Sequence, residues 1–172
     1  PAYSCKLQQA TLQNPAATLE PGNSGVIPMT LKNTGNQVAT WNFGATFPNI
    51  DWVDNAEIKW MFDGSEVSNL ELALTDDINI DAIITVPPQV SPGTYPVILL
   101  ASGMSPAQYL AEWQVNIVVP IYSDLIIEPE VTNLLAPADD SLRWIEIRLI
   151  NDGNSPESFE LRLQADWKLG IE

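Results

Sequence analysis

Two similar stretches decide the fold of this chain: LKNTGNQVATW at residues 31–41 and LINDGNSPESF at residues 149–159. In each, an apolar strand end runs into an Asn-x-Gly-Asn turn, and apolar residues follow it. Asn and Gly are typical of tight turns, and Gly35 is free to adopt positive φ. Each stretch therefore predicts a β-hairpin with one buried face.

The two stretches belong to a longer internal repeat. Asn33 and Asn151 are 118 residues apart, and the same offset places Ile27, Met29 and Leu31 on Ile145, Ile147 and Leu149. Upstream, LEPGNS (19–24) matches LAPADDS (135–141) with one inserted residue. The shared turn, apolar pattern and entry signal indicate a tandem repeat.

Alternation with period two dominates the chain and predicts strands. No segment shows a convincing helical period. Besides the stretch before Asn33, the alternating segments are those at about residues 39–47, 56–62, 68–74, 78–86, 94–101 and 109–119. Their short spacing and the intervening Pro and Gly signals are typical of an antiparallel sandwich. The predicted fold is all-β: immunoglobulin-like antiparallel β-sandwiches in tandem, the second copy incomplete.

We expect one complete sandwich at residues 1–120 and the first half of a second, about three strands, at residues 121–172. The second copy would expose an apolar face containing Ile147, Leu149, Phe159 and Leu161, because two or three strands cannot bury such a face alone. Three explanations stay open: the natural chain continues, a neighbouring subunit supplies strands by strand complementation, or the partial copy folds back onto the first domain.

Composition narrows the possible functions. The chain has 22 acidic and 7 basic residues in dispersed order, and its net charge of −15 argues against binding nucleic acid. It contains no histidine, which rules out a Ser-His-Asp triad and the commonest transition-metal ligand. No apolar run is long enough for a membrane-spanning helix. The single cysteine, Cys5, excludes an intrachain disulfide and is expected to act as a small apolar residue.

LEPGNSGVIPMTLKNTGNQVATW (19–41) resembles the opening of the immunoglobulin-like domain found beside the carbohydrate-binding module of some alpha-galactosidases. It is also similar to CARDB-type adhesion domains of prokaryotic, including archaeal, surface proteins. IDAIITVPPQVSPGTYPVILLAS (80–102) resembles the later part of the same pattern. The resemblance implies a non-catalytic, extracytoplasmic module. This sequence departs from the usual pattern between Trp52 and Leu74, which is longer and more aromatic.

Two groups of polar residues deserve a test as ligand sites. DDINID (76–81) places Asp77, Asn79 and Asp81 on one strand face, and oxygen ligands suit calcium. Same-face neighbours stand almost 7 Å apart, however, so the polar face of an exposed strand explains them equally well. Asp139 and Asp140, in the turn before the second Asn-x-Gly-Asn motif, have the same status.

The other group surrounds Trp52, where an exposed ring beside Asp51, Asp54 and Asn55 would suit a sugar. Trp52 could equally close the end of the sandwich. Trp41, Trp60 and Trp113 lie in the core phase of their strands and are expected to pack inside.

The function that we expect is a non-catalytic structural or interaction module of an extracellular or cell-surface repeat protein, with a role in adhesion, a surface layer, a filament or spacing. The alternative is a carbohydrate-binding accessory domain of a secreted glycoside hydrolase. No catalytic, metal or cofactor site is expected within these residues. Expected partners are proteins, either neighbouring repeats or subunits, and possibly carbohydrate.

Overall fold

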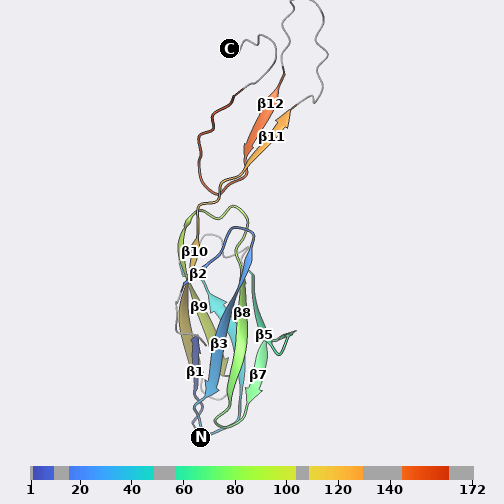
Figure 1. Ribbon diagram of the computed structural model, residues 1–172. Helices are drawn as coiled ribbons and strands as arrows, with labels where there is room; N and C mark the ends of the chain where they lie inside the picture. Colours follow the sequence, from blue (N-terminus) through green and yellow to red (C-terminus); the bar gives the residue numbers. More distant parts are fainter. Residues whose placement is uncertain (1, 10–15, 49–56, 104–108, 130–144, 163–172) are drawn as a thin grey trace, which may run out of the picture.

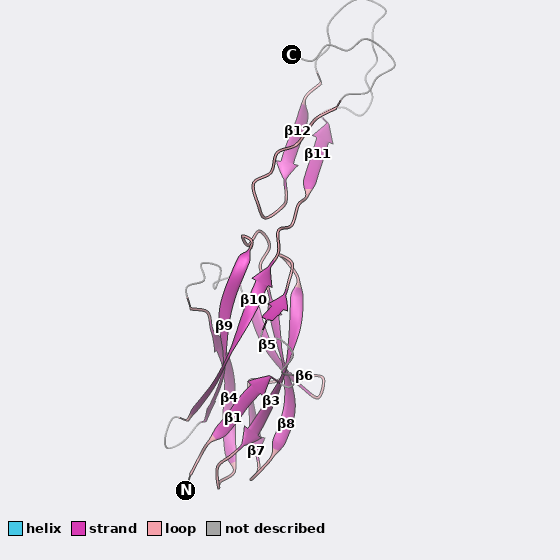
Figure 2. Cartoon of the chain, turned by 60° about the vertical axis from the view of Figure 1, so that its left-hand side comes forward, coloured by secondary structure: helices cyan, strands magenta, loops and turns pink. Residues whose placement is uncertain are grey.

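A computed structural model describes residues 2–9, 16–48, 57–103, 109–129 and 145–162. These residues form strands, turns and loops, without a helix. Most of the strands build two facing sheets, which form the larger, lower part of the molecule in Figure 2. The described part of the chain therefore contains no helix that could cross a bilayer.

The first sheet has five strands in the order β1-β3-β8-β5-β6, all antiparallel. Its long central strands have the strict alternation that the sequence displays, with apolar side chains on the face turned towards the other sheet. The strands are β1 (Cys5–Gln9), β3 (Ser24–Asn33), β5 (Glu57–Phe62), β6 (Ser65–Glu66) and β8 (Asp77–Thr85).

The second sheet also has five strands, in the order β2-β10-β9-β4-β7. The short β2 pairs in parallel with β10, so this sheet is mixed; its other neighbours are antiparallel. The strands are β2 (Ala16–Thr18), β4 (Ala39–Thr46), β7 (Asn69–Leu72), β9 (Gly93–Gly103) and β10 (Leu110–Val119).

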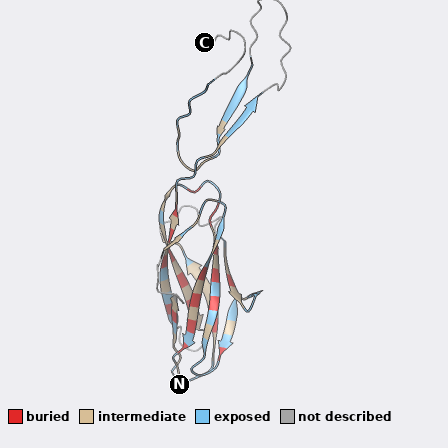
Figure 3. Cartoon of the chain, in the orientation of Figure 1, coloured by how far each residue is buried: buried red, intermediate tan, exposed pale blue. Residues whose placement is uncertain are grey.

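The core lies between these two sheets. Figure 3 shows the buried residues recurring along the strands of the sandwich, as period-two alternation requires. Met29 and Leu31 on β3 are fully buried, and so are Trp41 on β4 and Ile117 on β10. This arrangement is an immunoglobulin-like β-sandwich, as the sequence predicted.

The hairpin predicted for residues 31–41 is wrong. Strands β3 and β4 are neighbours in sequence but lie in different sheets, so the Asn33–Asn36 turn is an arch that crosses the core. An arch and a hairpin place apolar residues in the same alternating pattern, because both strands face one core. The pattern alone could not distinguish them.

The second Asn-x-Gly-Asn motif follows a separate two-stranded sheet. Here β11 (Leu125–Pro129) pairs antiparallel with β12 (Ile147–Asn151). Figure 1 shows this pair beyond the end of the sandwich at which β10 ends. Residues 156–162 form no strand, so the strand expected around Phe159 and Leu161 is not observed there.

Candidate functional site

The most specific polar structure in the described chain is the turn at Asn33, which we call the asparagine clamp. The Asn33 Oδ1 atom accepts the Gly35 N–H at 3.0 Å, which closes the turn. Its Nδ2 group donates to the carbonyls of Gln37, Leu72 and Ala73 at 2.9, 3.2 and 3.0 Å. Asn33 is only 1% exposed, and both its side-chain oxygen and its side-chain nitrogen are hydrogen-bonded, as is usual for a buried amide.

The clamp also holds the segment that enters the sandwich. The Thr34 N–H donates to the Ser4 carbonyl at 3.0 Å, and the Asn36 N–H donates to the Ala2 carbonyl at 2.9 Å. In return, the Ala2 N–H donates to Asn36 Oδ1 at 2.7 Å. These bonds explain why the turn does not close a hairpin: its N–H groups bind the entering chain rather than β4.

Gly35 is required here for space, not for a left-handed backbone. The glycines with positive φ in the described chain are Gly22 and Gly64, so the role predicted for Gly35 is wrong. A Cβ atom on Gly35 would lie 2.5 Å from the Ala2 carbonyl oxygen and 2.9 Å from the Ser4 nitrogen. Only glycine permits this close approach of two backbones.

The bonds within the turn and those to the entering segment recur at the second Asn-x-Gly-Asn motif. Asn151 Oδ1 accepts the Gly153 N–H at 3.0 Å, and Asn151 Nδ2 donates to the Ser155 carbonyl at 2.8 Å. The Asn154 N–H donates to the Tyr122 carbonyl at 3.0 Å, and the Tyr122 N–H donates to Asn154 Oδ1 at 2.7 Å. The repeat found in the sequence is therefore a repeat of hydrogen-bond geometry.

Further bonds tie the second clamp to the connection between the two copies. Asn154 Nδ2 donates to the Pro120 carbonyl at 2.9 Å, and the Ser123 hydroxyl donates to the Glu157 carboxylate. The Tyr122 hydroxyl donates to the Asp124 carboxylate at 3.3 Å, and this negative charge raises the pKa of Tyr122. Strand β10 ends at Val119, and the next residue, Pro120, is the one whose carbonyl accepts the Asn154 bond.

The loops at the end of the sandwich face the second clamp across an open cavity of about 230 Å³. Its walls come from both copies: Pro21, Pro88 and Gln89 on the sandwich side, and Tyr122, Asp152 and Asn154 on the other. Among the described residues that line it, Asp152 supplies a carboxylate.

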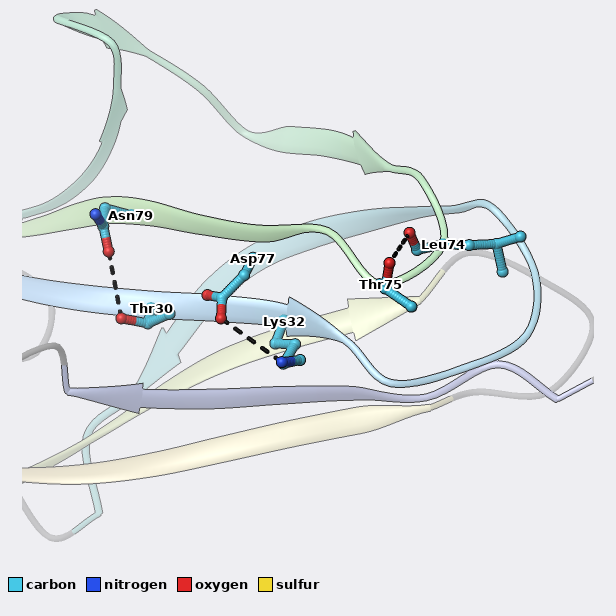
Figure 4. Close-up of polar contacts among 6 residues, drawn as sticks. All are labelled: Thr30, Lys32, Leu74, Thr75, Asp77 and Asn79. Carbon is cyan, nitrogen blue, oxygen red and sulfur yellow. Dashed lines mark hydrogen bonds and ion pairs between the residues drawn. The ribbon is translucent and has the colours of Figure 1, made fainter.

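Of the predicted calcium residues, Asp77 and Asn79 make local contacts on the surface of the sandwich (Figure 4), and Asp81 is an exposed residue of β8. Asp77 pairs with Lys32 at 3.8 Å, and Asn79 Oδ1 accepts the Thr30 hydroxyl at 3.4 Å. Asp76 Oδ2 accepts the Ala73 N–H at 2.8 Å and so caps the turn between β7 and β8. In the described ranges, no group of three or more acidic, Cys or His residues is placed to hold a metal ion.

The tryptophans that the structure describes belong to the core. Trp41 is fully buried, Trp60 stacks on Phe43 with ring centroids 5.1 Å apart, and Trp113 packs against the same cluster. The predicted sugar-binding residues Asp51, Trp52, Asp54 and Asn55 lie outside the described residues. The same holds for Asp139 and Asp140.

Comparison with known proteins yields structural likeness only. No family model matches the chain, and no curated protein matches it. A family 123 glycoside hydrolase from Clostridium perfringens shares 9% identity over 69% of this chain and 27% of its own, with a TM-score of 0.48. The chain thus corresponds to about a quarter of that enzyme.

Two further solved structures are similar over comparable lengths. The PapD-like domain 7 of human CEP192 shares 14% identity over 67% of this chain and 84% of its own, with a TM-score of 0.41. Domains 4 and 5 of the S-layer protein SbsC share 15% identity over 67% and 53%, with a TM-score of 0.36. The specific resemblance to alpha-galactosidase accessory and CARDB-type domains stays a prediction.

Proposed function

We propose that this chain is a non-catalytic structural module of a repeat protein, in which each copy enters the next through an asparagine clamp. The observation that carries the proposal is the repetition of the clamp. In both motifs the Asn side chain accepts the Gly N–H, and the Gly backbone lies against the backbone of the entering segment. A recurrent junction of this kind is what a spacer or filament needs. We further propose residues 1–120 and 121–172 as the two domains.

The positions of entry and exit support a rod. The described chain enters the sandwich at Ala2–Ser4, beside the end of β3. It leaves the sandwich after Val118, near the start of β3, because the Val118 carbonyl accepts the Leu19 N–H. Because β3 has 10 residues, entry and exit are separated by about 33 Å at the usual rise of a strand. Repetition of such units produces an extended array rather than a compact cluster.

We place this module outside the cell or on its surface, with adhesion, a surface layer or spacing as its role and other protein modules as its partners. The support is the sequence resemblance to adhesion domains and a net charge of −15, which favours solubility and repels nucleic acid. Antibodies against the sandwich, applied to intact cells of the source organism, test the location: binding that appears only after lysis contradicts it.

A rod requires a junction that keeps its orientation, and residual dipolar couplings measure this directly. We expect the amides of the sandwich and those of β11 and β12 to fit one alignment tensor in the 172-residue chain. Two tensors with very different magnitudes would mean that the copies reorient freely, and the spacer proposal would then fail.

A further inference from the structure

The pair β11–β12 matches β1–β3 in register as well as in position. Cys5 faces Asn33 and Leu7 faces Leu31 in the sandwich. In the second copy, Leu125 faces Asn151 and Ile127 faces Leu149. Each pair therefore ends at the Asn of its clamp, and β12 is the counterpart of β3.

The two pairs differ in what lies along the far edge of the second strand. In the sandwich this edge of β3 is covered by β8, in a ladder that runs from Ser24 to Lys32. Within the described residues, the sheet of β12 contains β11 alone. Ile147 and Leu149 are 43% and 37% exposed, whereas their counterparts Met29 and Leu31, which also pack against the opposing sheet, are each 0% exposed.

The hydrogen bonds of the clamp Asn also differ between the two copies. Asn33 donates to the carbonyls of Leu72 and Ala73, at the turn that leads into β8, and its own N–H donates to the Asp76 carbonyl at 2.9 Å. Asn151 keeps the internal bonds of the clamp, but in the described part of the chain it makes no bond to a strand beyond β12. It is exposed, although Asn33 is buried.

We propose that the edge of β12 facing away from β11 binds a β8-type strand from a module of this same repeat, in the register that β8 adopts on β3. The proposal rests on the repeat architecture proposed above and names the partner of its second copy. The reason is internal to the chain: an equivalent strand, clamp and apolar face already hold such a strand in the sandwich.

The sandwich fixes the geometry of this contact. Ile80 faces Met29 and Ile78 faces Leu31, so the bound strand places apolar side chains opposite Ile147 and Leu149. The position between them is Asn79 in β8 and faces Arg148, which suits a polar or acidic residue. The turn preceding the strand presents two carbonyls to Asn151 Nδ2. Main-chain pairing supplies affinity and the alternate apolar positions supply specificity.

A synthetic peptide with the sequence of residues 69–86, added to the full 172-residue chain, tests the proposal. Hydrogen exchange is followed at the amides of residues 147–151. We expect saturating peptide to slow their exchange by about tenfold or more, because strand pairing protects edge amides. A peptide with Ile78→Ser and Ile80→Ser is expected to give no protection.

The matched control peptide carries Asn79→Ser and Asp81→Ser, which alter the opposite face and leave the apolar face intact. It is expected to protect residues 147–151 as the unaltered peptide does. Absence of protection, equal protection by all three peptides, or protection confined to the sandwich would each overturn the proposal. Since no residue of the protein is changed, misfolding cannot mimic these results, and the dipolar-coupling test of the junction is unaffected by them.

Discussion

At the scale of single residues, the asparagine clamp depends on two residues that the sequence shows and on one contact that it does not show. The Asn and the Gly of each motif are visible as a turn signal. Their partner in the first copy, the backbone of Ala2–Ser4, lies in a stretch without any strong pattern. Sequence reasoning therefore found the turn but assigned Gly35 the wrong role.

Replacement of Gly35 by alanine is expected to destabilise the sandwich by about 1–3 kcal/mol, the usual cost of forcing a methyl group into a filled space. The new Cβ would meet the backbone of Ala2 and Ser4, which cannot rotate away as a side chain can. Urea unfolding followed by tryptophan fluorescence measures the loss. Gly44→Ala is the matched control, since a Cβ on Gly44 meets nothing within 4 Å; equal losses in both variants would contradict this account.

Asn33→Ala is expected to cost more stability than Asn151→Ala. The first change takes the Asn33 amide away from the carbonyl of the buried Leu72, and the loss of a donor to a buried carbonyl typically costs about 1–3 kcal/mol. The second removes bonds at an exposed turn, where water replaces them. Urea titration of both variants makes the comparison, and a larger loss for Asn151→Ala would show that the burial of Asn33 is not what matters.

The Cys5 thiol is expected to react slowly in the folded protein. Burial raises its pKa from 9.0 to about 12, so the reactive thiolate is scarce at pH 8. The unfolded chain loses this proton above about pH 9, and ionisation of Cys5 therefore lowers the stability of the fold as the pH rises from about 9 to about 12. Labelling with a disulfide reagent at pH 8, before and after guanidinium unfolding, measures the difference; equal rates would refute it.

At the scale of elements, periodicity predicted most strands correctly but not their connections. The even positions of residues 78–86 are buried or half-buried as expected, and the sandwich follows from many such strands. Pairing depends on contacts between distant residues, so the arch at Asn33 and the parallel β2 could not be read from local sequence. The recurrence of the Asn-x-Gly-Asn turn, in contrast, could be predicted by comparing the chain with itself.

At the scale of the whole molecule, Asn154 connects the two copies. We expect Asn154→Ala to let the copies reorient, because it removes both the bond to the Pro120 carbonyl and the acceptor for the Tyr122 N–H. Residual dipolar couplings should then require two alignment tensors. Asn36→Ala makes the equivalent change at the opposite end of the sandwich and should leave the junction unaltered. A single shared tensor in Asn154→Ala would show that the clamp does not orient the second copy.

The central claim is that one clamp is built twice, at Asn33 and again at Asn151. Amide hydrogen exchange of the unmodified chain, resolved by residue, tests it most directly. Thr34 and Asn36 donate to the entering segment of the first copy, and Asp152 and Asn154 donate to that of the second. We predict that all four amides exchange more slowly than free peptide. Protection of Thr34 and Asn36 with free exchange at Asp152 and Asn154 would contradict the claim.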